Sequence, residues 1–295
     1  MQSSLSIIIP TYRRPDILRE CLRRIEAQTI RDRLEVIVVS DGEDARTRSL
    51  FADISFPFPL DFFSIPKSQQ GVARNHGVER ARAPYILFIG DDMFLEPDAC
   101  GKHLKVHERQ MNNGHSTAVL GHVAWDPAVG ITPAMRWLDR TGWQFGYRFL
   151  SPYAHKEIPR KIQHRFTYTS QISLPTSVAR GFPFREDAVL YGWEDIEWGM
   201  RLRDAGIPLF FEPDAKALHH HHLSDEDSLR RMETLGRSAV IFQKFKPELH
   251  IVPTGFKLLL YRLAALLTTT GGRHRRAFLK GMETFTREKG GQNIA

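Results

Sequence analysis

The most informative part of the sequence is the run Tyr85-Ile86-Leu87-Phe88-Ile89-Gly90-Asp91-Asp92, in which apolar residues are followed by a glycine and a pair of aspartates. An apolar run of this length is typical of a strand that is buried on both faces. Adjacent carboxylates directly after such a strand repel each other unless a cation or a hydrogen-bond donor compensates them. The pattern allows two interpretations: a site for a hard cation such as Mg²⁺ or Mn²⁺, or a polar turn in which one aspartate caps a helix.

The part of the chain before Asp91 repeats this pattern of apolar runs separated by helical segments. Strands are predicted over Leu5 to Pro10, Glu35 to Ser40 and Leu60 to Ile65, and helices from Pro15 and over Gly71 to Ala83. The alternation predicts an α/β fold with a largely parallel, doubly wound sheet, which binds ligands at the carboxyl ends of its strands. The polar residues that follow the strands are therefore expected to face a common site: Thr11, Tyr12, Asp41, Asp91 and Asp92.

The second half of the chain is less regular. Aromatic residues are frequent between Trp125 and Tyr168, where they either shape an acceptor site or belong to the core. A helix is predicted over Trp193 to Ala205, because Gly206 is a natural stop signal. Two short strands are predicted over Leu209 to Phe211 and Ala215 to Leu218, and helices after Ser224.

Several motifs that follow one another along the chain resemble glycosyltransferase family 2, whose members have a GT-A fold. The motifs are Ser6 to Tyr12, Glu35 to Gly42, Gly71 to Gly77, Tyr85 to Asp92, and Gly192 to Asp195. The resemblance implies one GT-A domain over residues 1–222, followed by a basic helical extension over 223–295. It also implies inverting transfer of a sugar from a nucleotide diphosphate sugar, most often a UDP-sugar, to an acceptor hydroxyl.

The same resemblance implies roles for the residues after the strands. Pro10, Thr11 and Tyr12 would lie against the nucleotide base. Asp41 would accept a hydrogen bond from the ring edge of uracil or its equivalent, with Arg74 nearby. Asp91 would reach the ribose and Asp92 would hold the metal on the diphosphate. One departure affects this assignment, because many members carry aspartate where this chain has Gly90.

A second acidic pair, Glu194-Asp195, stands at the start of the helix predicted from Trp193. Carboxylates are favoured there by the helix dipole alone, which is the purely structural interpretation. Inverting transfer needs a general base, and adjacent helical residues project about 100° apart, so only one of the pair is expected to face the acceptor. The resemblance favours Asp195 as the catalytic base, with Glu194 as the alternative.

Four consecutive histidines occupy residues 219–222. They follow a predicted strand, so His219 and His221 are expected to share one side. A zinc site is one interpretation of such a run. The family resemblance instead implies that His219 is a metal ligand beside Asp92, and an imidazole ligand favours Mn²⁺ over Mg²⁺. Which of the four histidines binds the metal stays open.

The net charge of +7 is concentrated near the C-terminus. Residues 244–289 contain ten Lys or Arg against three acids, an excess equal to that of the whole chain. Such a segment fits an anionic surface, either membrane or nucleic acid, or a solvated helix face. The apolar run from Phe256 to Leu267 contains Arg262 and is too short to span a bilayer. We expect peripheral contact with an anionic membrane, and no nucleic acid partner.

The cysteine content points to the cytoplasm. Cys21 and Cys100 are the only cysteines, which fits a reducing compartment, and no signal peptide is visible. The expected site of action is therefore cytoplasmic, with possible attachment to the inner face of the membrane. The acceptor is expected to be a glycan or a lipid-linked molecule, as in polysaccharide biosynthesis.

Two alternative functions fit the sequence less well. A sugar nucleotidyltransferase would need a Gly-rich, basic loop after the first strand, where this chain has Pro10-Thr11-Tyr12. A non-catalytic protein that binds nucleic acid or an anionic surface would leave Asp92, Glu194 and Asp195 without a role. The sequence therefore predicts a metal-dependent glycosyltransferase.

Overall fold

The computed structural model describes residues 3–52, 55–112, 114, 116–187 and 189–290. They group into two compact units, which are described separately. The sheet unit contains the described residues within 1–129, 145–187 and 195–221, and the helical unit those within 130–144, 188–194 and 222–295. Two short segments, 130–144 and 188–194, thus belong to the helical unit although they precede residue 222, a division that the sequence did not indicate.

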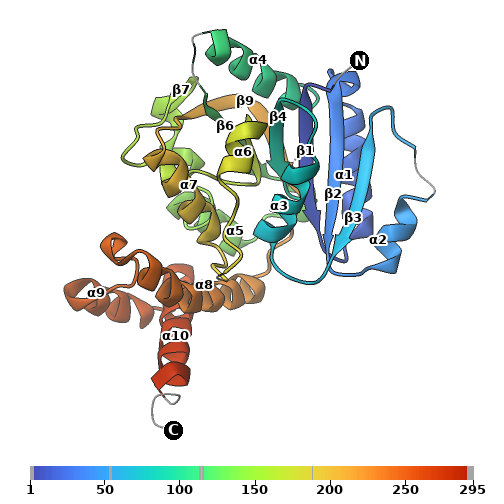
Figure 1. Ribbon diagram of the computed structural model, residues 1–295. Coiled ribbons are helices and arrows are strands. Elements are labelled where there is room, and N and C mark those ends of the chain that lie inside the picture. Colours follow the sequence, from blue (N-terminus) through green and yellow to red (C-terminus); the bar gives the residue numbers. More distant parts are fainter. Residues whose placement is uncertain (1–2, 53–54, 113, 115, 188, 291–295) are drawn as a thin grey trace. The chain divides into compact units, whose positions relative to one another are not determined.

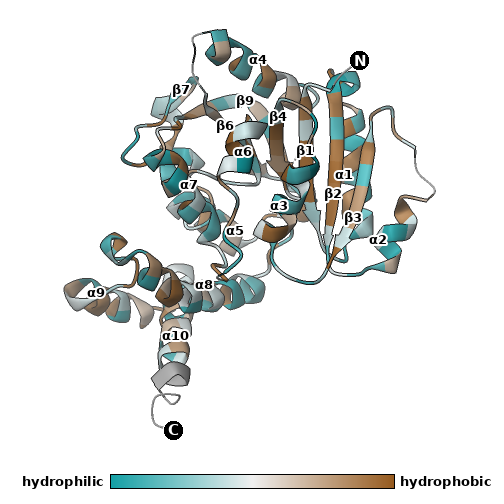
Figure 2. Ribbon diagram, viewed as in Figure 1, coloured by the Kyte–Doolittle hydropathy of each residue, from teal (hydrophilic) through white to brown (hydrophobic). Residues whose placement is uncertain are grey.

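The first four strands of the sheet unit form a parallel array (Figure 1). They are β1 (Leu5–Thr11), β2 (Leu34–Asp41), β3 (Leu60–Ile65) and β4 (Tyr85–Ile89), and their order is β3-β2-β1-β4. Every residue of β1, β2 and β4 is buried, as expected for near-continuous apolar strands covered on both faces. Figure 2 shows the hydrophobic character of β1 and β2.

The remainder of the sheet is mixed rather than parallel. Its strands are β5 (Met93–Leu95), β6 (Ala118–Trp125), β7 (Lys156–Glu157), β8 (Gln171–Pro175) and β9 (Leu209–His219). Strand β8 is antiparallel to both β4 and β6, whereas β6 and β9 are parallel. The parallel arrangement predicted from the sequence therefore applies to the first four strands, and the sheet as a whole is mixed α/β.

Strand β9 is continuous, so the prediction of two short strands in this region was wrong. The interruption expected at Glu212-Pro213-Asp214 is a shift of register instead. Leu120 pairs with Phe211, and His122 already pairs with Lys216. Such a bulge accommodates a proline, which has no N–H to donate to the neighbouring strand.

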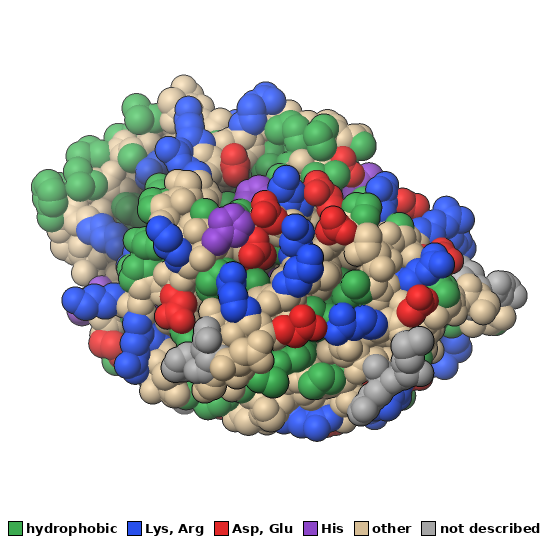
Figure 3. Space-filling model, turned by 90° about the horizontal axis from the view of Figure 1, so that it is seen from above, with side chains coloured by type: hydrophobic (Ala, Val, Ile, Leu, Met, Phe, Trp, Pro, Cys, Tyr) green, Lys and Arg blue, Asp and Glu red, His purple; other side chains and the backbone are tan. Residues whose placement is uncertain are grey.

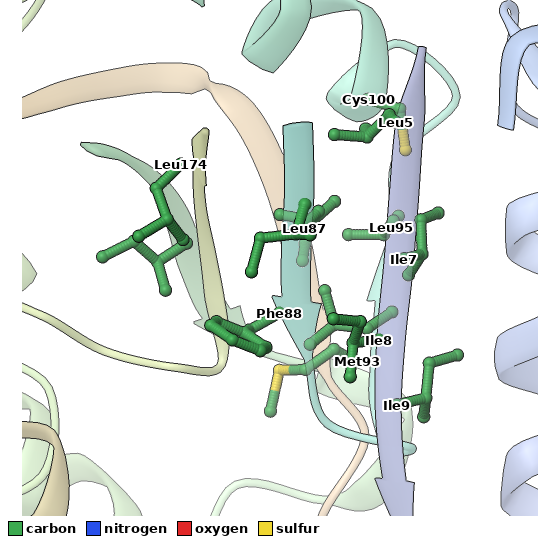
Figure 4. Close-up of a cluster of buried hydrophobic side chains, with 14 of the residues drawn as sticks. Leu5, Ile7, Ile8, Ile9, Leu87, Phe88, Met93, Leu95, Cys100 and Leu174 are labelled. Atoms are coloured by element: carbon green, nitrogen blue, oxygen red, sulfur yellow. The ribbon is translucent and has the colours of Figure 1, made fainter. Parts of the chain in front are cut away.

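Helices connect and cover the strands of the sheet unit. They are α1 (Pro15–Glu26), α2 (Ala45–Leu50), α3 (Gln70–Arg80), α4 (Ala99–Asn112), α6 (Thr176–Gly181) and, almost entirely, α7 (Glu194–Asp204). The predicted starts of α1, α3 and α7 agree with the structure to within one residue. The apolar core lies between these helices and the strands, and Figure 4 shows part of it, with Ile8 of β1, Phe88 of β4 and Leu174 of β8 among the buried side chains.

The helical unit consists of α5 (Pro133–Thr141), α8 (Asp225–Phe245), α9 (Gly255–Ala265) and α10 (Thr270–Gly290). Helices α8 and α10 make a close backbone contact through two glycines. A Cβ on Gly236 would lie 2.0 Å from Phe278 O, and one on Gly281 would lie 1.9 Å from Glu233 O. Larger residues at these two positions would force the helices apart.

Two tryptophans of the aromatic stretch belong to the helical unit. Trp137 packs on His274 with ring centroids 4.4 Å apart, and Trp143 packs edge-on against Phe278 at 6.1 Å. These side chains are part of the internal packing of this unit. None of the described helices is both long enough and apolar enough to cross a membrane.

Candidate active site

The predicted site residues at the ends of β1 and β4 meet in the structure. Thr11 is the last residue of β1, and Asp91 follows β4 by two positions. The hydroxyl of Thr11 donates a 2.7 Å hydrogen bond to Oδ2 of Asp91. The strand ends are brought together because β1 is paired in parallel with β4 on one side and with β2 on the other.

The two adjacent carboxylates share one basic partner, Arg14. Its guanidinium donates to Oδ2 of Asp92 at 2.8 Å and also to Asp91. Burial raises the pKa of Asp91 to about 6, an effect that Asp92 adds to and Arg14 opposes. Burial acts on Asp92 as well, yet hydrogen bonds from His219 and His221 hold the pKa of Asp92 well below its usual range. Of the two carboxylates, Asp92 is therefore the one that stays ionised to lower pH.

Asp92 and two of the four histidines form a group of potential metal ligands. His219 Nε2 lies 3.6 Å and His221 Nδ1 3.4 Å from Oδ2 of Asp92. Their donor atoms all lie within 4.8 Å of one another, with Asp92 and His219 buried and His221 more exposed. His220 faces elsewhere, with Nδ1 2.7 Å from Asp126 Oδ2. His219 and His221 thus share a side, as the sequence predicted.

The residues of this group suit a divalent transition metal. Ligands bonded at about 2.1 Å and at right angles are roughly 3 Å apart. The two histidine nitrogens lie only a few tenths of an ångström farther than this from Asp92 Oδ2. One carboxylate and two imidazoles are a donor set that Mn²⁺ accepts more readily than Mg²⁺. Trp125 stacks on His219 at 4.9 Å with ring planes 11° apart and fixes the imidazole orientation.

A second histidine–carboxylate group joins His155, which precedes β7, to two acids of the bulged part of β9. His155 Nδ1 is 3.1 Å from Oε1 of Glu212, and its Nε2 is 3.9 Å from Asp214. His155 and Asp214 are exposed there. This group contains none of the residues that follow the parallel strands.

The proposed base-binding residues gather around Lys67. The Nζ atom of Lys67 lies 3.8 Å from the centre of the Tyr12 ring and 2.7 Å from Oδ2 of Asp41. Asp41 also accepts hydrogen bonds from the backbone N–H and the hydroxyl of Ser68. Tyr12 is partly exposed, at 37%, whereas Pro10 is buried within β1. A flat, partly exposed ring beside a carboxylate is a suitable surface for a nucleobase.

Arg74 lies on α3. It is buried, donates to Gln70 Oε1 at 3.2 Å and lies over the ring of Phe184. Its positive charge lowers the pKa of Asp195. Arg74 is thereby electrostatically coupled to the proposed base.

Two threonines of a neighbouring loop bond to Asp195: the Thr167 hydroxyl donates to its backbone carbonyl oxygen at 2.7 Å, and Thr169 binds its side chain. The backbone N–H of Thr169 donates to Oδ2 at 3.1 Å, and the Thr169 hydroxyl lies 3.0 Å from Oδ1. Burial raises the pKa of Asp195 above its usual value, while Arg74 and Thr169 oppose this effect. A raised pKa makes a carboxylate a stronger base, and Asp195 retains acceptor capacity because an ionised carboxylate has about four lone-pair positions. Glu194 is half-buried as the first residue of α7.

Aromatic rings connect the metal-ligand group with the loop that holds Asp195. The ring of Phe145 lies edge-on to His219, at 5.8 Å, and to Tyr168, at 5.3 Å. Tyr168 precedes Thr169 directly, and its ring also packs on Tyr147. This part of the predicted aromatic stretch therefore packs between the metal-ligand group and the Thr169 loop.

Four residues of the site were not identified in the sequence. The sequence signal that could have identified Arg14 is its position: the Arg13-Arg14 pair follows β1 and directly precedes Pro15, where α1 begins. Lys67, Ser68 and Thr169 lie on loops whose local sequence carries no comparable pattern. Their contacts depend on how the loops fold back over the strand ends.

Comparison with known proteins agrees with these features. The chain is 26% identical to the uncharacterized glycosyltransferase YfnE of Bacillus subtilis over 263 residues, 75% of this chain and 65% of that protein. It is 30% identical to the succinoglycan biosynthesis protein ExoM of Rhizobium meliloti over 217 residues, 72% of this chain and 65% of that protein. The matched region thus covers 65% of the length of each of these two relatives.

Solved structures show the same GT-A fold. The mannosyltransferase PcManGT from Pyrobaculum calidifontis, in complex with GDP-Man and Mn²⁺, has a TM-score of 0.64 and 16% identity, covering 98% of this chain and 88% of that one. TarS 1–349 from S. aureus, in complex with UDP-GlcNAc, has a TM-score of 0.54 and 15% identity, covering 97% and 92%. The family model for Glycosyl transferase family 2 matches residues 6–169, more than half of the sequence, and the protein belongs to this family.

Proposed function

We propose that the protein is an inverting glycosyltransferase that moves a sugar from a nucleotide diphosphate sugar to an acceptor hydroxyl. The observation that carries this proposal is the group formed by Asp92, which follows the parallel strand β4, with His219 and His221 at the end of β9. Family membership and the glycosyltransferase names of the relatives support it. So do the nucleotide sugars bound in solved structures of the same fold.

The proposed cofactor is a divalent cation, with Mn²⁺ favoured over Mg²⁺. Asp92, His219 and His221 would hold it, because they combine one buried carboxylate with two imidazoles. When bound, the cation supplies positive charge that stabilises the departing diphosphate. Arg14 lies against the same carboxylate and would keep Asp92 ionised and oriented.

The proposed donor is a UDP-sugar, with GDP- and dTDP-sugars as alternatives. Tyr12 would stack on the base, Asp41 would accept a hydrogen bond from its edge, and Asp91 would contact the ribose. The contacts of Tyr12 and Asp41 with Lys67 support this assignment, because they hold an aromatic face and a carboxylate side by side. Thr11 and Pro10 would form the wall behind them.

The proposed general base is Asp195. Its carboxylate would take the proton of the acceptor hydroxyl while that oxygen forms a bond with the anomeric carbon. The bond between that carbon and the diphosphate breaks on the opposite side, and the configuration at the carbon is inverted. Thr169 orients the carboxylate, and its raised pKa favours proton uptake. The acceptor would be a glycan or a lipid-linked sugar, met in the cytoplasm or at the inner face of a membrane.

A nucleic acid partner is not part of this proposal. On the face that Figure 3 shows, Lys and Arg side chains are interspersed with Asp and Glu and do not form one continuous basic patch. A phosphate backbone is usually bound by a concentrated basic surface.

Calorimetry with UDP, GDP and dTDP, each with Mn²⁺ and with a chelator, tests the proposal directly. We expect one nucleotide to bind much more tightly with Mn²⁺, and the corresponding nucleotide sugar to release nucleoside diphosphate during turnover. Asp92→Asn should lose the effect of Mn²⁺. The exposed Asp16→Asn, which alters an acid of α1, is the matched control. Absence of nucleotide binding under every condition would overturn the proposal.

A further inference from the structure

Helix α9 carries an unusual concentration of exposed apolar side chains. Of the large hydrophobic residues that are exposed on the described chain, half lie within residues 256–267. They are Phe256 at 74%, Leu259 at 51%, Leu260 at 48%, Leu263 at 53%, Leu266 at 75% and Leu267 at 55% exposure. Exposed single residues of this kind are ordinary, but a contiguous set marks an interaction surface.

These residues lie on one face of the helix. Successive helical residues are about 100° apart, so Leu259, Leu260 and Leu263 fall within about 60° of Phe256 around the axis. Leu266 and Leu267 continue the same stripe directly after the last helical residue, Ala265. Figure 2 shows hydrophobic residues along α9. The face is apolar along its whole length.

The opposite face of α9 is already engaged within the helical unit. Leu258 and Tyr261 are half-buried and Ala265 is buried. The ring of Tyr261 packs on Phe278 at 6.5 Å, and Arg276 donates to the carbonyl oxygen of Ala265 at 2.7 Å. The helix is therefore fixed to α10 by its inner side, and the outer apolar face takes no part in that packing.

Two exposed cations border the apolar face. Lys257 and Arg262 lie about 100° and about 120° from Phe256, on either side of the stripe. Both are exposed, and α9 contains no acidic residue. Long basic side chains at the borders of an apolar face can reach the headgroup level of a bilayer while the apolar residues enter the acyl region.

We propose that the outer face of α9 binds the surface of a membrane that contains anionic lipids, with the helix axis in the plane of the interface. A helix of eleven residues is about 16 Å long, too short to span the hydrocarbon core. A second copy of this chain is a poorer partner, because its α9 would bring further cations and no acidic residue to the contact. Anionic headgroups match the bordering charges instead. This inference concerns binding alone, so failure of glycosyl transfer would not affect it.

Vesicle flotation of the full chain tests the inference, with vesicles of phosphatidylcholine alone and of phosphatidylcholine with phosphatidylglycerol. We expect binding to the anionic vesicles that weakens as salt rises. Leu259→Glu combined with Leu263→Glu should weaken binding by roughly tenfold or more, because each places a charge in the acyl region. Lys257→Gln with Arg262→Gln should weaken it by roughly fivefold for each cation removed.

The matched control is Met111→Glu combined with Phe149→Glu, which alters exposed apolar residues of the sheet unit and should leave vesicle binding unchanged. The inference is overturned if the unmodified chain ignores anionic vesicles at low salt. It is equally overturned if the two leucine substitutions leave binding intact. A dimer in sedimentation analysis that these substitutions dissociate would assign the face to a second copy of the chain.

Discussion

The carboxylate of Asp92 occupies the space beside the Cα atom of Gly90. A Cβ atom added at Gly90 would lie 2.8 Å from Oδ1 of Asp92, closer than real Cβ atoms come to other heavy atoms. A side chain at position 90 would therefore press on the Asp92 carboxylate, which lies against Arg14 and His219, and the carboxylate would have to shift to make room.

The first prediction follows from this contact. Gly90→Ala should push the Asp92 carboxylate away from the two histidines and weaken Mn²⁺-dependent UDP binding by about tenfold, equivalent to ~1.4 kcal/mol. The measurement is calorimetric UDP affinity with Mn²⁺. Gly181→Ala is the control, since a Cβ there meets nothing within 4 Å. Unchanged affinity in Gly90→Ala would mean that Asp92 binds the metal from another position.

Arg14 and a metal ion should compensate the same pair of carboxylates. Arg14→Gln leaves Asp91 and Asp92 without their shared cation. The metal-free protein should therefore lose about 1–3 kcal/mol of its free energy of unfolding. The loss is smaller than for a fully buried ion pair, because the Arg14 side chain is partly exposed. Added Mn²⁺ should then raise the unfolding temperature more in this variant than in the unmodified protein. Arg46→Gln, which removes an exposed arginine paired with Asp16, serves as control. An equal rise in both proteins would show that Arg14 and the metal act on different groups.

Two buried histidines should make the fold sensitive to acid. His103 and His107 on α4 lie 2.8 Å and 2.7 Å from the Ser173 hydroxyl, and burial lowers the pKa of each to about 3. An unfolded chain protonates histidine near pH 6.5. The unfolded state therefore binds more protons between about pH 6.5 and 3, and stability is full above this window and falls as the pH decreases through it.

For each histidine, the free energy of unfolding is expected to fall by up to ~1.4 kcal/mol per pH unit once the pH is well below 6.5. Urea unfolding between pH 7.5 and 5 measures it. His103→Gln combined with His107→Gln should flatten the pH dependence, whatever its effect on stability at pH 7.5. Identical slopes for both proteins would contradict the assignment of acid sensitivity to these histidines.

Local sequence patterns predicted the parts of the site that follow strands. Thr11, Asp41 and Asp91 could be placed at one edge of the sheet because buried parallel strands have an unmistakable apolar pattern and bring their carboxyl ends together. The shared facing of His219 and His221 followed from strand periodicity in the same way. These predictions required no knowledge of how distant segments pack.

Other features depend on packing between distant segments, and the sequence did not contain a local signal for them. Thr169 reaches Asp195 from a loop 26 residues earlier, and Lys67 reaches Asp41 from 26 residues later. The continuity of β9 through Pro213 depends on its register with β6. The two loop contacts join short polar segments whose composition would suit many other arrangements.

The last prediction separates chemistry from donor binding at Asp195. Asp195→Asn keeps the size of the side chain, and the carbonyl oxygen of the new amide can still accept the hydrogen bond from the Thr169 backbone N–H. The amide cannot take a proton from the acceptor, so the transfer rate at saturating donor should fall by about 10² to 10⁴. The donor dissociation constant with Mn²⁺ should barely change, because Asp41 and Asp92 are unaltered. Asp92→Asn should instead weaken the metal-dependent binding of the donor as well as lower the turnover.

Glu194→Gln is the control that distinguishes the two adjacent acids. Thr169 bonds to the side chain of Asp195, so we expect Glu194→Gln to retain most of the transfer rate. If Glu194→Gln loses turnover while Asp195→Asn keeps it, the base is Glu194 and Asp195 serves to anchor the loop at Thr169. If both variants remain active, neither acid is the base, and the pair acts only at the start of α7, where its charge is favoured by the helix dipole.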